Sequence, residues 1–173
     1  MKNAVRAYWL VPAKSYAEFF RKVIGVLAKE FDAPLFEPHL TLWVAPQDRQ
    51  AARQILRQVH RLPIRLKISG VSSSSKFTKT LFVQFKSSRA LNRLIVDLAH
   101  ATRRRAQALR DPHLSLLYRT MPLAAKAEVV DTIKLPFPEV LFDSINAVRC
   151  ASPTRNRSDV EAWRVLATKR LCG

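Results

Sequence analysis

The feature that most constrains the fold of this chain is an internal repeat. The hexapeptides Glu37–Leu42 and Asp111–Leu116 match position by position: an acid, a proline, a histidine, a leucine, a hydroxyl residue and a leucine. Both copies stand at the start of a strand-like segment that a helix-like segment follows, which is the pattern of a duplicated half-fold. The repeat therefore predicts two related lobes.

Helix-like and strand-like patterns alternate along the chain in two similar rounds. Helical spacing of apolar residues predicts helices at 15–31, 48–60, 88–107 and 122–133. Alternating, β-branched and aromatic runs predict strands at 4–11, 38–44, 64–69, 81–85, 113–118, 140–142, 145–150 and 163–167. We therefore predict an α+β fold in which residues 1–173 form a single domain of two lobes related by a pseudo-twofold axis. Each lobe is expected to hold an antiparallel sheet flanked by helices, with the active site in the cleft between the lobes.

The chain is strongly basic, because 30 lysines and arginines stand against 13 acidic residues, for a net charge of +17. Such a charge does not determine the fold, but it favours anionic partners and steers them inward. We expect the partner to be an anionic small-molecule cyclic phosphate or an RNA end. An anionic membrane surface and a charged face with no binding role are the alternatives.

No apolar run reaches the roughly 20 residues that a membrane-spanning helix requires, so we expect no membrane partner. Cys150 and Cys172 form neither a disulfide framework nor a zinc pattern. We interpret them as two reduced thiols, with a single bridge as the alternative. The chain is accordingly predicted to be a cytoplasmic monomer.

The spacing within each hexapeptide places chemistry on one face of a strand. Side chains two residues apart in a strand share a face, so His39 lies beside Thr41 and His113 beside Ser115. The leucines between and after them point to the opposite, buried face. If the lobes pack about a pseudo-twofold axis, the two histidine–hydroxyl pairs face one another across a cleft and surround one anion.

Two imidazoles around an anion suit in-line displacement at a strained cyclic phosphate. A neutral histidine can take a proton from the attacking water while a protonated one delivers a proton to the departing ribose oxygen. We predict His39 and His113 as the catalytic pair, with no metal and no cofactor. Thr41 and Ser115 are predicted to bind the non-bridging oxygens, where negative charge builds up. The pattern leaves open which histidine is the base.

The two H-x-[ST] strands resemble the signature of the two-histidine (2H) phosphoesterases. The run Pro112–Tyr118 is similar to that of the cyclic phosphodiesterase branch best known from plants, and Ser158–Trp163 is similar to that branch's closing strand. The resemblance implies a bilobal α+β fold, no metal, and hydrolysis of cyclic phosphates. Its substrates would be nucleoside 2′,3′-cyclic phosphates, opened to 2′-phosphates, or ADP-ribose 1″,2″-cyclic phosphate, opened to ADP-ribose 1″-phosphate. The charge of +17 is unusual for a metabolite-handling relative and favours an RNA end.

Two aromatic residues are further candidates for the substrate site. The family pattern places Tyr118 on the pocket wall, although strict alternation from Ser115 puts it on the opposite face, so the two agree only if the strand ends or bulges near Leu117. Strict alternation places Trp43 on the face of His39, where it could stack on a base; a core tryptophan is the alternative.

The same sequence features admit other interpretations. The chain could act on RNA 2′,3′-cyclic phosphate ends as a phosphodiesterase or, in reverse, as a ligase, or it could be a non-catalytic RNA-binding module. The two histidines could also be core residues, or could bind a metal together with Glu37 and Asp111. Lys76 and Lys79 could reach the phosphate, with a solvated loop as the simpler interpretation.

Overall fold

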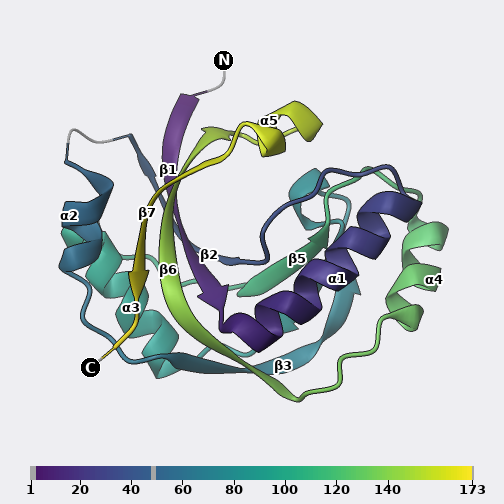
Figure 1. The fold of residues 1–173 in the computed structure, drawn as a ribbon, viewed down its shortest axis with the longest axis horizontal. Helices are drawn as coiled ribbons and strands as arrows, with labels where there is room; N and C mark the ends of the chain where they lie inside the picture. The colour runs from purple at the N-terminus through teal and green to yellow at the C-terminus, as the bar shows by residue number, and fades with distance from the viewer. Residues whose placement is uncertain (1–2, 48–49, 173) are drawn as a thin grey trace.

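Seven strands pair antiparallel in one sheet in the computed structural model, which describes residues 3–47 and 50–172 (Figure 1). The strands are β1 (Asn3–Pro12), β2 (Leu40–Pro46), β3 (Ile64–Ser73), β4 (Leu81–Phe85), β5 (His113–Leu117), β6 (Glu139–Ser152) and β7 (Arg164–Arg170). The helices are α1 (Lys14–Glu30), α2 (Ala52–Arg57), α3 (Arg89–Ala101), α4 (Leu123–Thr132) and α5 (Arg157–Glu161), and a 3₁₀ turn spans Phe77–Lys79.

The order of the strands brings the two hexapeptides together. The sheet runs β1-β2-β5-β4-β3-β6-β7, and β1 also pairs with β6. β6 joins the two sides of the sheet, because its first residues pair with β3 and its later residues pair with β1 and β7. The hexapeptide strands β2 and β5 are neighbours, so the fold itself places the repeated motifs side by side.

Four of the five helices in the described part of the chain, α1 to α4, fall into two pairs that cover different parts of the sheet. α1 contacts β5 and α4 contacts β3, whereas α2 contacts β7 and α3 contacts β2. In Figure 1 the first pair lies on one side of the molecule and the second pair on the other. The apolar stripes of α1 and α3 are buried at helical spacing: Phe20, Ile24 and Leu27 in α1, and Leu91, Leu94, Ile95 and Leu98 in α3. Each such side chain contributes roughly 1.5–3 kcal/mol on leaving water, which holds these helices to the sheet.

The predicted α+β fold is confirmed, with differences in detail. The strands predicted at 140–142 and 145–150 form one continuous strand, β6. The segment Ser158–Trp163, which resembles a closing strand, instead contains most of helix α5, and the closing strand β7 begins only at Arg164. The arrangement as two lobes about a pseudo-twofold axis stays a prediction.

Two predicted helices are shorter than expected. The helix predicted at 48–60 is observed as α2, and its predicted residues 48 and 49 lie outside the described residues. The helix predicted at 88–107 ends at Ala101, because Arg103 adopts a left-handed backbone conformation with φ 54° and the chain turns away. None of the described helices is long and apolar enough to cross a membrane.

Candidate active site

The pairing of β2 with β5 brings the two histidines together. Leu40 of β2 lies opposite Leu114 of β5, and both leucines are fully buried. In an antiparallel pair the residues flanking such a partner pair face each other crosswise, so the His39 position lies toward Ser115 and Thr41 toward His113. The alternation within each strand and the pairing between them thus gather four side chains around one point.

The hexapeptide on β2 ends in a one-residue bulge. Successive residues of β1 pair with Thr41 and Trp43, which leaves Leu42 as an extra residue on β2. A bulge of this kind shifts the alternation of faces beyond it. Val44, rather than Trp43, therefore shares the face of Thr41.

The hexapeptide on β5 carries the same bulge at the equivalent leucine. Successive residues of β4 pair with Ser115 and Leu117, which leaves Leu116 as the extra residue. Beyond it, Tyr118 shares the face of Ser115, and β5 ends at Leu117. The expectation that the strand bulges or ends near Leu117 agrees with the observed backbone.

One hollow of about 350 Å³ contains most of the predicted site. Its wall includes five of the six predicted residues: His39, Thr41, His113, Ser115 and Tyr118. Val44 of β2, Thr78 of the 3₁₀ turn, and residues of β1, β6 and the segment between β6 and β7 complete the wall. We call this hollow the histidine pocket.

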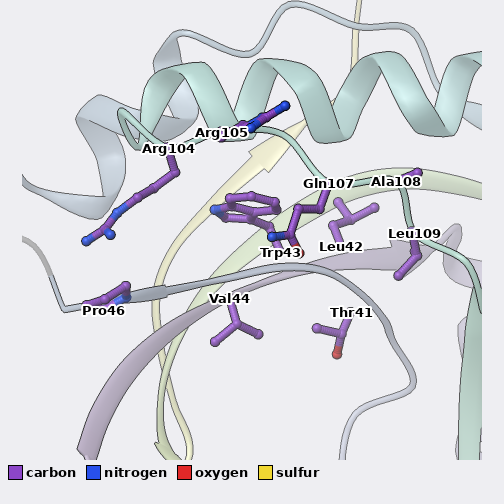
Figure 2. Close-up of a pocket in the computed structure, with 10 residues that line it drawn as sticks. All are labelled: Thr41, Leu42, Trp43, Val44, Pro46, Arg104, Arg105, Gln107, Ala108 and Leu109. Atoms are coloured by element: carbon purple, nitrogen blue, oxygen red, sulfur yellow. The ribbon is translucent and has the colours of Figure 1, made fainter.

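Trp43 is the predicted site residue that lies elsewhere. Figure 2 shows its ring on the opposite side of β2 from Thr41 and Val44. Its indole Nε1 donates a hydrogen bond of 3.1 Å to Oγ1 of Thr102, just beyond α3. The prediction that Trp43 shares the face of His39 is wrong, because the bulge at Leu42 shifts the alternation that the prediction assumed.

Both histidine rings are held by the same hydrogen bond. Nδ1 of His39 lies 2.6 Å from the carbonyl oxygen of Glu37, and Nδ1 of His113 lies 2.8 Å from the carbonyl oxygen of Asp111. A carbonyl oxygen can only accept, so Nδ1 carries the proton in both rings. The other nitrogen, Nε2, is thereby left for a ligand in each ring, as a base when neutral and as an acid when protonated.

Aromatic side chains surround His39. Its ring stacks on Trp9, with centroids 3.7 Å apart and planes 12° apart, and Trp163 meets it edge-on at 5.8 Å. Only 6% of the His39 residue is exposed. Burial lowers the pKa of His39 to about 4, because desolvation disfavours the charged ring; the bond to Glu37 partly opposes this effect, and the charge of His113 adds to it.

Charged side chains surround His113, which is more exposed. Burial lowers the pKa of His113, the Asp111 carbonyl and carboxylate oppose that, and the charges of Lys79 and Lys76 lower it further. Lys79 forms an ion pair with Asp111, and its Nζ lies 4.1 Å above the Phe82 ring. Burial alone would raise the pKa of Asp111, but Lys79 and the charge of His113 hold it below its usual value. Lys79 is therefore fixed beside His113 and is not part of a solvated loop.

The two hydroxyl residues of the motifs differ in their hydrogen bonds. Oγ of Ser115 donates to the carbonyl oxygen of Thr78 at 2.8 Å. Burial raises the pKa of Tyr118, and the nearby Ser115 side chain offsets only part of the rise, so this phenol keeps its proton. Thr41 makes no side-chain hydrogen bond with the described residues. Its hydroxyl is available to an anion in the pocket, whereas that of Ser115 must first turn from Thr78.

The pocket also contains residues that the sequence patterns do not single out, among them Trp9, Trp163, Cys150 and Val44. Trp9 and Cys150 come from β1 and β6, strands that the repeat does not mark, so their place follows only from the sheet topology. Burial raises the pKa of the Cys150 thiol, and both cysteines are free, as expected. Val44 could have been found by comparing the repeats further, because it follows His39 by the same five residues as Tyr118 follows His113.

Comparison with known protein families agrees with this geometry. The family described as cyclic phosphodiesterase-like protein matches residues 4–171. The chain belongs to this family. The predicted membership of the two-histidine phosphoesterases, in their cyclic phosphodiesterase branch, is thereby confirmed. A comparison with curated protein sequences gives no significant match.

Solved structures share the fold of this cyclic phosphodiesterase-like protein. E. coli LigT complexed with 3′-AMP is 15% identical, with a TM-score of 0.61 and full coverage of both chains. TT0787 of Thermus thermophilus is also 15% identical, with a TM-score of 0.58 and coverage of 99% of this chain and 98% of that one. At this identity the likeness establishes the fold alone.

The carboxylates considered as metal ligands have other partners in this family member. Glu37 pairs with Arg21 at 2.8 Å, and Asp111 pairs with Lys79. Among residues 3–47 and 50–172, no group of three or more His, Cys, Asp or Glu side chains is arranged to hold a metal ion. What the pocket does assemble is two imidazoles and two hydroxyl residues, which can exchange protons with a bound anion and hydrogen-bond to its oxygens.

Proposed function

We propose that this cyclic phosphodiesterase-like protein hydrolyses cyclic phosphodiesters without a metal ion, with His39 and His113 as its acid–base pair. The observation that carries the proposal is the matched geometry of the two rings. Both histidines line one pocket, and each is followed two positions later by a hydroxyl residue. In each ring Nδ1 donates a hydrogen bond to the backbone carbonyl two residues earlier. Two Nε2 atoms at one anion site can supply both proton transfers that opening a cyclic phosphate requires.

His39 is the general base in this proposal and His113 the general acid. The pKa of about 4 keeps His39 neutral near pH 7, and a histidine must be neutral to act as a general base. His113 is more exposed and adjoins the Asp111 carboxylate, and an anion bound between the rings favours its protonated form. The different surroundings thus support opposite roles for two residues with the same local structure.

The bonds and protons balance in a single displacement. The oxygen of a water molecule attacks phosphorus while Nε2 of His39 takes its proton. The bond from phosphorus to the ribose 3′ oxygen breaks, and that oxygen receives the proton from Nε2 of His113. A nucleoside 2′-phosphate results, and both histidines return to their starting states by proton exchange with solvent. Thr41, and Ser115 once it has turned, donate to the non-bridging oxygens.

The size and lining of the pocket favour a nucleoside 2′,3′-cyclic phosphate over ADP-ribose 1″,2″-cyclic phosphate. About 350 Å³ lies at the small end of the roughly 300–1,000 Å³ typical of ligand pockets. Trp163 is partly exposed on the wall and offers its ring to a base or ribose. LigT in the comparison above is complexed with 3′-AMP, a nucleoside phosphate of the same chemical kind.

The test is a substrate panel assayed in the presence of EDTA. We expect 2′,3′-cyclic mononucleotides to be converted to 2′-phosphates, detected by chromatography, and the His39→Ala/His113→Ala variant to be inactive with an unchanged circular dichroism spectrum. Activity that disappears in EDTA and returns with Zn²⁺ or Mn²⁺ would establish a metal enzyme instead. RNA binding without hydrolysis of any cyclic phosphate would establish a non-catalytic module. The monomeric state and the cytoplasmic location stay predictions.

A further inference from the structure

A loop rich in arginine connects α3 to the second histidine. Residues 103–110, which we call the arginine loop, include Arg103, Arg104, Arg105 and Arg110. All four are exposed. The loop leads directly into the Asp111-Pro112-His113 segment, so its position is tied to that of the catalytic residue.

A hollow of about 520 Å³ separates the arginine loop from β2 (Figure 2). We call it the arginine groove. Thr41 and Val44 line both this groove and the histidine pocket, so the two spaces border the same stretch of β2, with the side chains of both residues on the side of β2 away from the arginine loop. A second hollow, of about 700 Å³, extends from Arg105 and Gln107 to His113. The loop therefore adjoins the histidine pocket at both of its motifs.

The positive charge of the loop is not neutralised within the described part of the chain. None of the four arginines lies within ion-pair distance of a described carboxylate. Two nearby acidic residues have other partners. Asp97 of α3 pairs with Arg61 at 2.7 Å, and Asp111, which follows the loop, pairs with Lys79. Guanidinium groups without a carboxylate partner are suited to bind phosphate, often by two parallel hydrogen bonds.

The backbone holds the start of the loop against β2. The N–H of Arg104 donates to the carbonyl of Ala99 at 2.8 Å, and the N–H of Arg103 donates to that of His100 at 2.9 Å. This pair of bonds is the helix-ending turn that usually has glycine where Arg103 stands, at φ 54°. The bond from Trp43 to Thr102 then joins the turn to the strand. Arg104 and Arg105 thus leave a fixed turn at the groove.

We propose that the arginine groove binds the sugar–phosphate backbone of a single-stranded RNA whose 2′,3′-cyclic end occupies the histidine pocket. The proposal rests on the proposed function, and it names the RNA end as the substrate class. The pocket takes the terminal nucleoside and its cyclic phosphate, so the preceding nucleotides must leave through an adjoining space. The groove is such a space, and Arg104 and Arg105 in its lining match the negative charge of the strand.

The test compares substrates of increasing length. We expect kcat/KM to rise from a 2′,3′-cyclic mononucleotide to di-, tri- and tetranucleotides ending in the same cyclic phosphate, by about tenfold or more overall. It should then level off once the groove is filled. The dependence on salt between about 50 and 200 mM should be steep for the tetranucleotide and shallow for the mononucleotide, because each phosphate contact in a single strand adds about 0.7 to the logarithmic slope. Equal kcat/KM values at all lengths would overturn the proposal.

Matched variants separate local contacts from overall charge. Arg104→Gln/Arg105→Gln should lower the ratio of kcat/KM for the tetranucleotide to that for the mononucleotide by about tenfold, as expected for two solvent-exposed charged contacts. Arg89→Gln/Arg93→Gln removes the same charge from exposed residues of α3 and should leave the ratio unchanged. Equal losses in both variants would overturn the groove and leave only general electrostatic steering.

A binding measurement distinguishes this inference from the catalytic proposal. Fluorescence anisotropy of a labelled tetranucleotide with a 3′-phosphate needs no turnover and can use the His39→Ala/His113→Ala protein. Weaker binding on adding Arg104→Gln/Arg105→Gln, with no change on adding Arg89→Gln/Arg93→Gln, supports the groove even if no cyclic phosphate is hydrolysed. Hydrolysis of mononucleotides with no effect of the groove arginines on RNA binding supports the catalytic proposal and overturns the groove.

Discussion

The two halves of the histidine pocket have the same local structure and different surroundings. Both are built from the same hexapeptide, the same bulge at its last leucine and the same bond from Nδ1 to a carbonyl. The first half packs His39 against Trp9 and Trp163, whereas the second places His113 beside Lys79 and Asp111. One half is thus buried among aromatic rings and the other is partly exposed among charges.

The difference teaches how a duplicated motif can carry out two distinct steps. The repeated backbone determines which nitrogen each ring offers, and the neighbours determine how readily that nitrogen holds a proton. Burial lowers the pKa of His39 to about 4, while Asp111 opposes the lowering at His113. Two titratable groups whose environments differ in this way are suited to opposite acid and base roles.

The largest effect is expected from removing either histidine. His39→Ala and His113→Ala should each lower kcat/KM for a 2′,3′-cyclic mononucleotide by about 10²-fold or more, and the double variant should lose little beyond that. A substrate whose 3′ bridging oxygen is replaced by sulfur sharpens the comparison, because a thiolate leaves without needing a proton. On this sulfur-containing substrate, His113→Ala should recover most of the lost kcat/KM, whereas His39→Ala should recover none of it. Recovery by His39→Ala instead would exchange the two roles.

Stability should reveal the burial of His39 without any substrate. A histidine with a pKa of about 4 when folded and 6.5 when unfolded binds more protons in the unfolded state between those values, so folding weakens as pH falls through that range. At about 1.36 kcal/mol per pKa unit, the free energy of unfolding should fall by about 3 kcal/mol relative to His39→Gln between pH 6.5 and 4. Urea unfolding at several pH values measures it.

The matched variant for that measurement is His113→Gln. The free energy of unfolding of the wild type relative to His113→Gln should also fall between pH 6.5 and 4, but by less, because His113 is more exposed and Asp111 favours its charged form. Identical pH dependences for the two variants would show that the surroundings do not distinguish the histidines.

The two hydroxyl residues should differ by a smaller factor. Thr41 makes no side-chain hydrogen bond with the described residues, so its full contribution goes to the phosphate, whereas Ser115 must give up its bond to Thr78. Thr41→Ala should therefore lower kcat/KM by about tenfold and Ser115→Ala by only a few-fold. Thr41→Ser and Ser115→Thr keep the hydroxyl and serve as controls. A larger loss in Ser115→Ala would mean that its bond to Thr78 persists in the working site and positions it.

The sequence predicts well the local structure that the two halves of the pocket share, and it predicts poorly the surroundings that distinguish them. The shared face of His39 with Thr41, and of His113 with Ser115, follows from the strand period, which needs no knowledge of neighbouring strands. The gathering of the two pairs depends on the pairing of β2 with β5. The bulge at Leu42 cannot be predicted from the strand period, because it arises from the pairing of β2 with β1, whereas the sequence of one strand indicates only a regular alternation of faces. The prediction for Trp43 is wrong for that reason. The stacking of Trp9 on His39 depends on strand order, which no local pattern encodes. The surroundings that separate the two halves are therefore visible only in the fold.

The smallest expected effect is a shift in the pH dependence of kcat/KM, and it tests the half of the pocket around His113 directly. The charge of Lys79 lowers the pKa of His113 and Asp111 raises it, so Lys79→Gln should raise it and Asp111→Asn should lower it. An acid must be protonated, and kcat/KM therefore falls as pH rises through the pKa of His113 in the free enzyme. The falling limb of the profile should move to higher pH in Lys79→Gln and to lower pH in Asp111→Asn, while the rising limb set by His39 stays in place. Lys76→Gln should move the falling limb in the same direction as Lys79→Gln but less. If the rising limb moved instead, His113 would be the base, and the buried, aromatic half of the pocket would hold the acid.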